Sequence, residues 1–286
     1  MNNLKDQIQH KLRSANIAEQ VIYINIIVFV LTYVTKKVFG LMEWGENPFF
    51  NWFALPENFN NFFSKPWTII SYGFLHADFW HILFNLIMLF YLGNLFLDFF
   101  SKRDFLIYYF SGIVFGGLIF IFGYNYFPAL KTDDVAYLVG ASAGVTAILI
   151  GIATKIPNYA FHFRFIGAIK LWYIAIGFII LFIMQISAKI NTGGNLAHLG
   201  GALIGFLFTN QVDKGKNLSH FLSNLFKVKK QNPLKTVYKK SSPTNAIKNT
   251  NVHQRKIDEI LDKISKSGYE TLTKEEKDFL FTIGKK

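Results

Sequence analysis

Long apolar stretches alternate with short polar segments along residues 1–211. Six of these stretches approach the roughly 20 apolar residues that span a bilayer core. They run over residues 18–35, 80–100, 104–124, 139–154, 168–187 and 195–211. The fourth and sixth are short and rich in glycine and alanine, which is typical of helices buried within a bundle. The pattern predicts an all-α, polytopic membrane protein with six transmembrane helices.

Basic residues in the short connections orient the predicted spans. Lys102 and Arg103 separate the second and third spans, and Lys155, Arg164 and Lys170 separate the fourth and fifth. Because lysine and arginine mark cytoplasmic loops, we expect both termini to lie in the cytoplasm. No small-residue cleavage site follows the first apolar stretch, so we expect it to be a retained helix rather than a signal peptide.

Composition agrees with the membrane class, and charge separates the body from the tail. The chain is 51% hydrophobic and its mean hydropathy is +0.27. Cysteine is absent, which excludes disulfides, thiolate metal sites and a cysteine nucleophile. Residues 212–286 hold nine of the twelve net positive charges. Beside a membrane body, a basic tail indicates a cytoplasmic segment facing anionic lipid rather than a nucleic-acid partner.

Three predicted spans carry polar side chains near their beginnings. His81 and Asn85 lie in the second span, Ser142 in the fourth and His198 in the sixth. With the N-terminus inside, these three spans all run from the outside inwards. The four side chains should therefore share one depth just below the outer surface. Polar groups inside spans are costly and usually mark function.

A serine and a histidine that meet in a dry interior point to nucleophilic catalysis. A neutral imidazole can take the proton of a serine hydroxyl, which is otherwise a poor nucleophile. The Asn85 amide, the His81 ring and the Ser142 backbone N–H are candidate donors to an oxyanion. Because these spans offer no obvious carboxylate to orient His198, a dyad is favoured over a Ser-His-Asp triad.

Each of these residues also has a purely structural reading. A serine in a membrane helix usually bonds back to its own backbone, and a membrane histidine can serve packing alone. Two pairs of glycines, Gly140 with Gly144 and Gly201 with Gly205, predict close approach of the fourth and sixth spans. His76, before the second span, either supports a substrate cleft or is an ordinary interfacial residue. The joint pattern at one depth favours function for Ser142 and His198.

Three short motifs resemble those of the rhomboid family of intramembrane serine proteases. Residues 76–85, with His76, His81 and Asn85, resemble its H-x4-H-x3-N signature. Residues 140–143, around Ser142, are similar to its G-x-S-x nucleophile motif, and residues 197–201, with His198, match its A-H-x-x-G motif. The motifs follow the order of the family, and the resemblance covers roughly residues 18–211.

The resemblance implies a role for each of these residues. Ser142 would be the nucleophile, His198 the general base, and His81 and Asn85 would stabilise the oxyanion. It also implies a water-accessible cavity that opens to the outer face beneath a loop. The substrates would be membrane proteins cut at small residues near the outer end of a transmembrane segment. No metal or cofactor is implied, and the oligomeric state is left open.

Two features depart from the family pattern. Ala143 follows the nucleophile where many members have glycine, and Pro66-Trp67-Thr68 lacks the arginine of a common Trp-Arg pair in the first outer loop. Two rival functions remain: an inactive rhomboid relative that only binds membrane proteins, and a transporter. Loss of serine or histidine would signal the first, and internal repeats with ionisable groups near mid-span the second.

The chain after the membrane body divides into a linker and a predicted hairpin. The domains are then a cytoplasmic segment at 1–17, a rhomboid membrane domain at 18–211, a basic linker at 212–251 and a helical hairpin at 252–286. An apolar cluster in the linker, Leu222, Leu225 and Phe226, is either a surface helix or part of an unstructured segment. A capping box at 273–276 opens the second hairpin helix. The hairpin resembles a short C-terminal module of some bacterial rhomboids; a solvated extension without a partner is the alternative.

The frequencies of certain amino acids suggest the kind of organism from which the protein comes. Lysine, asparagine, isoleucine and phenylalanine are frequent, as in the proteins of AT-rich genomes, and no organelle transit peptide is visible. We therefore expect the protein in a bacterial cytoplasmic membrane.

Overall fold

The computed structural model describes residues 4–45, 47–130, 135–164, 167–213 and 246–283. The chain groups into two compact units, Met1–Lys227 and Val228–Lys286. The predicted linker falls largely outside the described residues, as does the apolar cluster at Leu222, Leu225 and Phe226. Each unit is described by itself.

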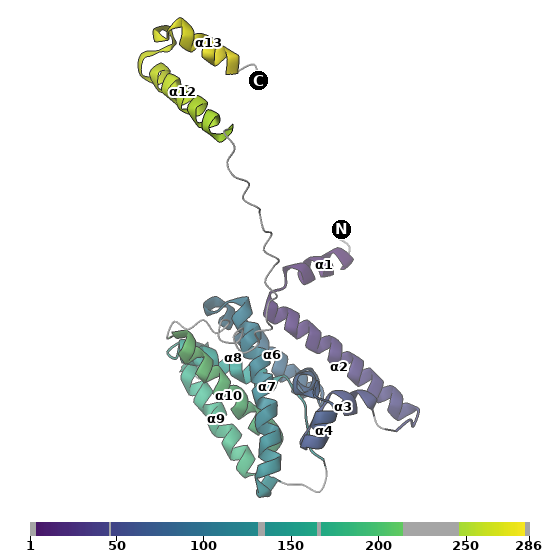
Figure 1. Ribbon diagram of the computed structural model, residues 1–286. Helices are drawn as coiled ribbons and strands as arrows, with labels where there is room; N and C mark the ends of the chain where they lie inside the picture. The colour runs from purple at the N-terminus through teal and green to yellow at the C-terminus, as the bar shows by residue number, and fades with distance from the viewer. Residues whose placement is uncertain (1–3, 46, 131–134, 165–166, 214–245, 284–286) are drawn as a thin grey trace. The chain divides into compact units, whose positions relative to one another are not determined.

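Among the described residues of the first unit, six long helices follow a short helix α1 (Leu4–Ser14) (Figure 1). They are α2 (Ile17–Leu41), α6 (Phe79–Phe99), α7 (Lys102–Tyr126), α8 (Ser142–Lys155), α9 (Leu171–Ser187) and α10 (Thr192–Asp213). Among the described residues, α2, α6 and α7 are long and apolar enough to cross a membrane, whereas α8 and α9 are shorter apolar helices. The chain is therefore a mostly helical protein with several membrane-type helices.

Side-chain caps fix where three of these helices begin. Asn16 and Glu19 form a capping box at the start of α2, and Ser101 and Asp104 form one at the start of α7. Asp78 caps α6, because its carboxylate accepts a hydrogen bond from the backbone N–H of His81 at 2.9 Å. Such caps satisfy backbone donors that the first helical turn leaves unpaired.

Short elements fill the long connection between α2 and α6. They are α3 (Pro48–Phe53), β1 (Leu55–Pro56), α4 (Phe59–Ser64), α5 (Thr68–Ser71) and the 3-10 turn η1 (Tyr72–Phe74). A second 3-10 turn, η2 (Pro128–Leu130), follows α7. The strand β1 pairs antiparallel with β2 (Tyr137–Leu138), so the first connection is tied to the segment that leads into α8.

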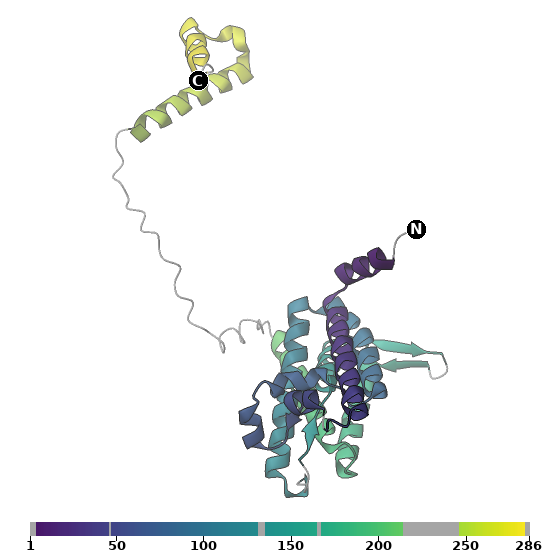
Figure 2. The same cartoon turned by 90° about the vertical axis from the view of Figure 1, so that its right-hand side faces the viewer.

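The expectation of an all-α chain is wrong at two short sheets. Besides β1 and β2, an antiparallel hairpin joins α8 to α9 and consists of β3 (Ala160–Phe163) and β4 (Gly167–Lys170). Figure 2 shows it standing out from the helices. The fifth apolar stretch, expected at 168–187, therefore becomes helical only at Leu171. Pairing with β3 satisfies backbone groups that an extended connection would otherwise leave unbonded.

Small residues bring α7, α8 and α10 into close contact. A Cβ added at Gly112 of α7 would lie 2.6 Å from the Cβ of Ala147 on α8, and one at Gly116 would lie 2.7 Å from that of Ala143. Gly201 and Gly205 of α10 face the backbone carbonyls of Ala143 and Ala147 in the same way. These positions allow helix backbones to approach, which is how membrane helices gain packing energy without a hydrophobic driving force.

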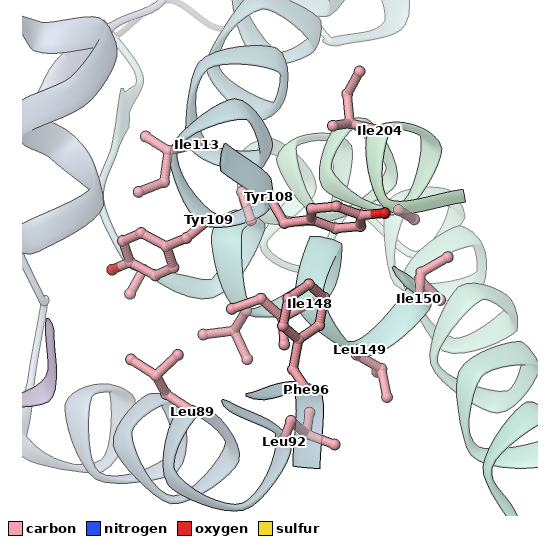
Figure 3. Packing of buried hydrophobic residues seen from close by; sticks show 14 of the residues in the cluster. Leu89, Leu92, Phe96, Tyr108, Tyr109, Ile113, Ile148, Leu149, Ile150 and Ile204 are labelled. Carbon is pink, nitrogen blue, oxygen red and sulfur yellow. The ribbon is translucent and has the colours of Figure 1, made fainter. Parts of the chain in front are cut away.

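Two neighbouring tyrosines of α7 connect this core to helices on opposite sides. Figure 3 shows Tyr108 and Tyr109 pointing in opposite directions. The Tyr108 hydroxyl lies 2.9 Å from the hydroxyl of Thr209 on α10, and the Tyr109 hydroxyl accepts a bond from Asn25 of α2 at 3.3 Å. Both tyrosines are fully buried.

The second unit is a helical hairpin. It contains α12 (Ala246–Ser267), the 3-10 turn η3 (Tyr269–Thr271) and α13 (Lys274–Ile283). Thr273 and Glu276 form the expected capping box, with N–H to oxygen distances of 2.8 and 3.3 Å. The Thr273 N–H, and next the Lys263 ammonium, lower the pKa of the Glu276 carboxyl. The limits of the four predicted domains remain a prediction.

Candidate active site

Ser142 and His198 meet in the first unit. The Ser142 Oγ lies 2.6 Å from Nε2 of His198. Ser142 is the first residue of α8, and His198 follows Thr192, where α10 begins, by six residues. The close approach of Gly201 to Ala143 brings these two helices together next to the pair. Nδ1 of His198 is buried and has no partner in the described part of the chain, so no carboxylate orients the ring.

Gly140 does not pack as expected. It precedes α8 and has φ +125°, a conformation that side chains rarely adopt. Its N–H donates to the carbonyl of Tyr72 at 3.0 Å. Gly144 packs instead against Tyr109 of α7. The predicted pairing of Gly140 with Gly144 on one helix face is therefore wrong, because the chain turns sharply before Ser142.

His81, on α6, comes close to the Ser142–His198 pair beside Gly140. A Cβ at Gly140 would lie 2.7 Å from Nε2 of His81 and 3.5 Å from the Ser142 Oγ. The absent side chain therefore leaves room into which both polar atoms project. The Asn85 amide is buried and donates to the carbonyl of His81 at 2.8 Å, one turn earlier on α6. Since an amide carries two N–H donors, one more is available.

His76 lies against His81. The two rings make an edge-to-face contact with centroids 5.1 Å apart. Both ring nitrogens of His76 are buried, and neither has a partner among the described residues. Burial, and next the nearby His81 ring, lowers the pKa of His76 to about 3. His76 is therefore neutral at physiological pH, and its contacts are those of a ring that supports His81.

A cavity of about 950 Å³ opens above the pair. Its lining includes all four predicted polar residues: His81, Asn85, Ser142 and His198. The remaining walls come from α3, α6, α7, η2, the segment around β2, α8, α9, the turn after α9 and the first residues of α10. In the described ranges, no group of three metal-ligating side chains gathers closely enough to hold a metal ion.

Phe182 of α9 is a site residue that the sequence did not reveal. It is buried, and its ring lies 4.4 Å from that of His198 between centroids. The contact packs the phenylalanine ring against the imidazole of the dyad. One phenylalanine among 32 in the chain carries no signal that would single it out.

The residues that form this site lie within a stretch that matches a known protein family. The rhomboid domain matches residues 64–212, which is more than half of the chain and includes all four polar residues. The chain belongs to the rhomboid family. A family of unknown function, DUF6576, matches residues 245–285, the helical hairpin of the second unit.

Two curated rhomboid relatives are similar at low identity. "Inactive rhomboid-related protein 2" of Caenorhabditis elegans is 25% identical over 167 residues, which cover 56% of this chain and 44% of the relative. "RHOMBOID-like protein 12, mitochondrial" of Arabidopsis thaliana is 24% identical over 198 residues, 63% of this chain and 59% of the relative. This rhomboid chain thus spans about half the length of the curated relatives it matches.

Proposed function

We propose that the chain is an intramembrane serine endopeptidase that uses Ser142 as nucleophile and His198 as general base. The observation that carries the proposal is the 2.6 Å contact between Ser142 Oγ and His198 Nε2 on the wall of a 950 Å³ cavity. A serine used only for packing would bond to a carbonyl of its own helix. Here it faces an imidazole from another helix, in a space large enough for a peptide segment.

The chemistry follows from this pair. Nε2 of a neutral His198 takes the hydroxyl proton while Oγ attacks the carbonyl carbon of the scissile bond. The resulting imidazolium gives that proton to the leaving amine, and the acyl group stays on Ser142. A water molecule, deprotonated by His198, then attacks the ester and frees the enzyme. No carboxylate takes part, so the two residues act as a dyad.

Three donors are suited to the oxyanion. The backbone N–H of Ser142 lies in the first turn of α8, where helical N–H groups have no partner within the helix. His81 accepts a long bond of 3.4 Å from Ala77 at Nδ1, which leaves the proton of its neutral ring on Nε2, beside Gly140. The second N–H of Asn85 completes the set. Donors of this kind stabilise the charge that develops on the carbonyl oxygen.

The membrane setting explains the depth of the site. We propose that all six long helices cross the bilayer and that both termini lie in the cytoplasm of a bacterial cell. At about 1.5 Å per residue, the 14 residues of α8 are too short for a core of about 30 Å. Ser142 then lies below the outer surface, and the cavity above it admits water. The substrates are membrane proteins cut at small residues near the outer end of a transmembrane segment.

A second candidate function is binding without cleavage. One relative carries the name "Inactive rhomboid-related protein 2", so a rhomboid domain alone does not establish catalysis. In that case the chain would hold membrane proteins in its cavity. The retention of Ser142 and His198 at hydrogen-bond distance favours the protease.

A fluorophosphonate probe separates the two functions. The full chain in detergent is incubated with the probe beside Ser142→Ala and a control, Ser187→Ala, whose serine is exposed at the end of α9. We expect the wild type and the control to be labelled and to cleave a single-span test substrate, and Ser142→Ala to do neither. Equal labelling of Ser142→Ala would exclude Ser142 as the reactive group. Substrate binding without labelling or cleavage by the wild type would favour the inactive reading.

A further inference from the structure

Two residues of opposite charge line the cavity above the dyad. Among the described lining residues, Asp78 is the one aspartate or glutamate and Lys189 the one lysine or arginine. The Asp78 carboxylate is engaged, because it caps α6 through the N–H of His81. Lys189 is exposed and pairs with no carboxylate in the described part of the chain. Among the described residues, the cavity therefore presents one lysine that no carboxylate pairs with.

The backbone that carries Lys189 is held in place. Lys189 has φ +57° and Asn191 φ +44°, so two non-glycine residues occupy the left-handed region in one turn. Asn195, fully buried at the start of α10, donates to the side chain of Gln185 at 3.0 Å and to the carbonyl of Ile190 at 2.9 Å. Strained backbone of this kind persists only where surrounding contacts impose it, and it clusters at binding sites. Lys189 thus projects from a fixed turn.

The distance from this turn to the dyad sets which substrate residue it meets. His198 follows the first residue of α10 by six positions, or about 9 Å along the axis at about 1.5 Å per residue. An extended peptide advances about 3.3 Å per residue. A substrate held at Ser142 therefore passes the turn roughly three residues from its scissile bond, and the flexible lysine side chain widens that reach by a residue or two.

We propose that Lys189 is a specificity-determining residue that favours substrates with an acidic side chain two to five residues from the scissile bond. The side concerned is the one that leaves the membrane. The inference rests on the proposed protease function, which supplies the scissile bond. Charge complementarity of this kind discriminates among partners more than it adds affinity. Because Lys189 is exposed and screened by salt, we expect a preference of about fivefold rather than a strict requirement.

Charge exchange on both partners tests the proposal. A single-span substrate with uncharged flanks is made with Asp, Asn or Lys at each of the four positions in turn. The full chain is compared as wild type, as Lys189→Gln and as Lys189→Glu. We expect wild type to cleave at least one Asp substrate about fivefold faster than its Lys counterpart, Lys189→Gln to show no preference, and Lys189→Glu to reverse it. High salt should reduce each difference.

Two controls separate this proposal from the function on which it rests. Lys36→Glu makes the same charge reversal at an exposed lysine of α2 that does not line the cavity, and it should keep the wild-type preference. Binding of the same substrates to Ser142→Ala protein, with and without Lys189→Glu, measures the preference without cleavage. The role of Lys189 would be overturned if Asp and Lys substrates were cleaved at equal rates and bound equally well, both with Lys189 and with Lys189→Glu. Loss of cleavage alone, with the binding preference intact, would count against the protease instead.

Discussion

The helices α8 and α2 are both apolar, yet they meet opposite surroundings. Eleven of the 14 residues of α8 are buried, and four of the 25 residues of α2 are. The α2 side chains that remain exposed include Ile24, Ile27 and Val30. Figure 1 shows α2 at the side of the group of helices and α8 among the others. One helix is thus largely buried, and the other keeps many apolar side chains exposed.

The difference shows what holds a membrane helix against its neighbours. Lipid tails are as apolar as isoleucine, so apolar character alone does not decide which side chains face protein. Between α8 and α10 the contact is made by small residues such as Gly201 and Ala143, which let backbones meet. The α2 helix makes its contact with α7 through a polar bond from Asn25 to Tyr109. Close packing fixes α8, and it is α8 that begins with Ser142.

The largest effect is expected where the backbones of α8 and α10 meet. Gly201→Leu places a side chain against the Ala143 carbonyl, where a single Cβ already collides. Because backbone has to move, we expect a loss of about 3 kcal/mol, the upper range of overpacking. The free energy of unfolding, measured by denaturant titration in detergent, tests this. If the variant does not fold, Gly201→Ala should show the same direction with a smaller loss.

Gly177→Leu on α9 is the matched control. No atom lies within 4 Å of a Cβ at that position. The same exchange should therefore leave the free energy of unfolding within about 0.5 kcal/mol of wild type. A similar loss at both glycines would mean that the loss at Gly201 does not come from the contact between α8 and α10.

The next largest change in the free energy of unfolding is expected when one isoleucine of α8 and one of α2 are each replaced by alanine. Ile148 is fully buried in α8 within the cluster drawn in Figure 3, whereas Ile27 of α2 is 58% exposed. Ile148→Ala leaves a cavity inside protein and should lower the free energy of unfolding by about 2 kcal/mol. Ile27→Ala leaves a space that a lipid or detergent chain can fill, so its effect should stay below about 0.5 kcal/mol. Equal losses for the two variants would show that Ile27 is packed against protein despite its large exposed fraction.

The sequence predicted the meeting of Ser142 with His198 because both lie near the beginnings of spans that were expected to run in one direction. Span spacing fixes depth, and the glycines of α10 fix the distance between helices. Depth does not specify rotation about a helix axis, however. The placement of Ser142 as the first residue of α8, with its hydroxyl towards His198 of α10, is seen only in the structure.

Other features had no sequence signal of their own. Gly140 resembled a helix-packing glycine because Gly144 follows at the right spacing, but its φ of +125° places it outside the helix. The short strands β3 and β4 adjoin an apolar stretch, so periodicity extended the fifth helix by three residues too many. Phe182 acts through a ring contact with His198 that links different helices. Each of these depends on tertiary contacts, which local pattern does not contain.

The smallest effect is expected at a polar bond between α2 and α7. Asn25→Ala removes the donor to the Tyr109 hydroxyl, which is fully buried. Polar bonds between membrane helices are worth about 0.6 kcal/mol on average, because the unfolded chain in the membrane finds other partners. We expect a loss of that size in the same titration. Thr35→Ala is the control, since its hydroxyl bonds to Leu31 within α2 itself.

A double-mutant cycle with Tyr109→Phe decides whether Asn25 stabilises the protein through this bond. If Asn25 and Tyr109 stabilise α2 through each other, the two losses should not add, and the coupling should approach the whole effect of Asn25→Ala. Additive losses would mean that Asn25 acts through its second bond, to the Val21 carbonyl of its own helix, at 2.8 Å. In that case α2 would lie against α7 by apolar contact alone, and its looser attachment would follow from the few residues it buries.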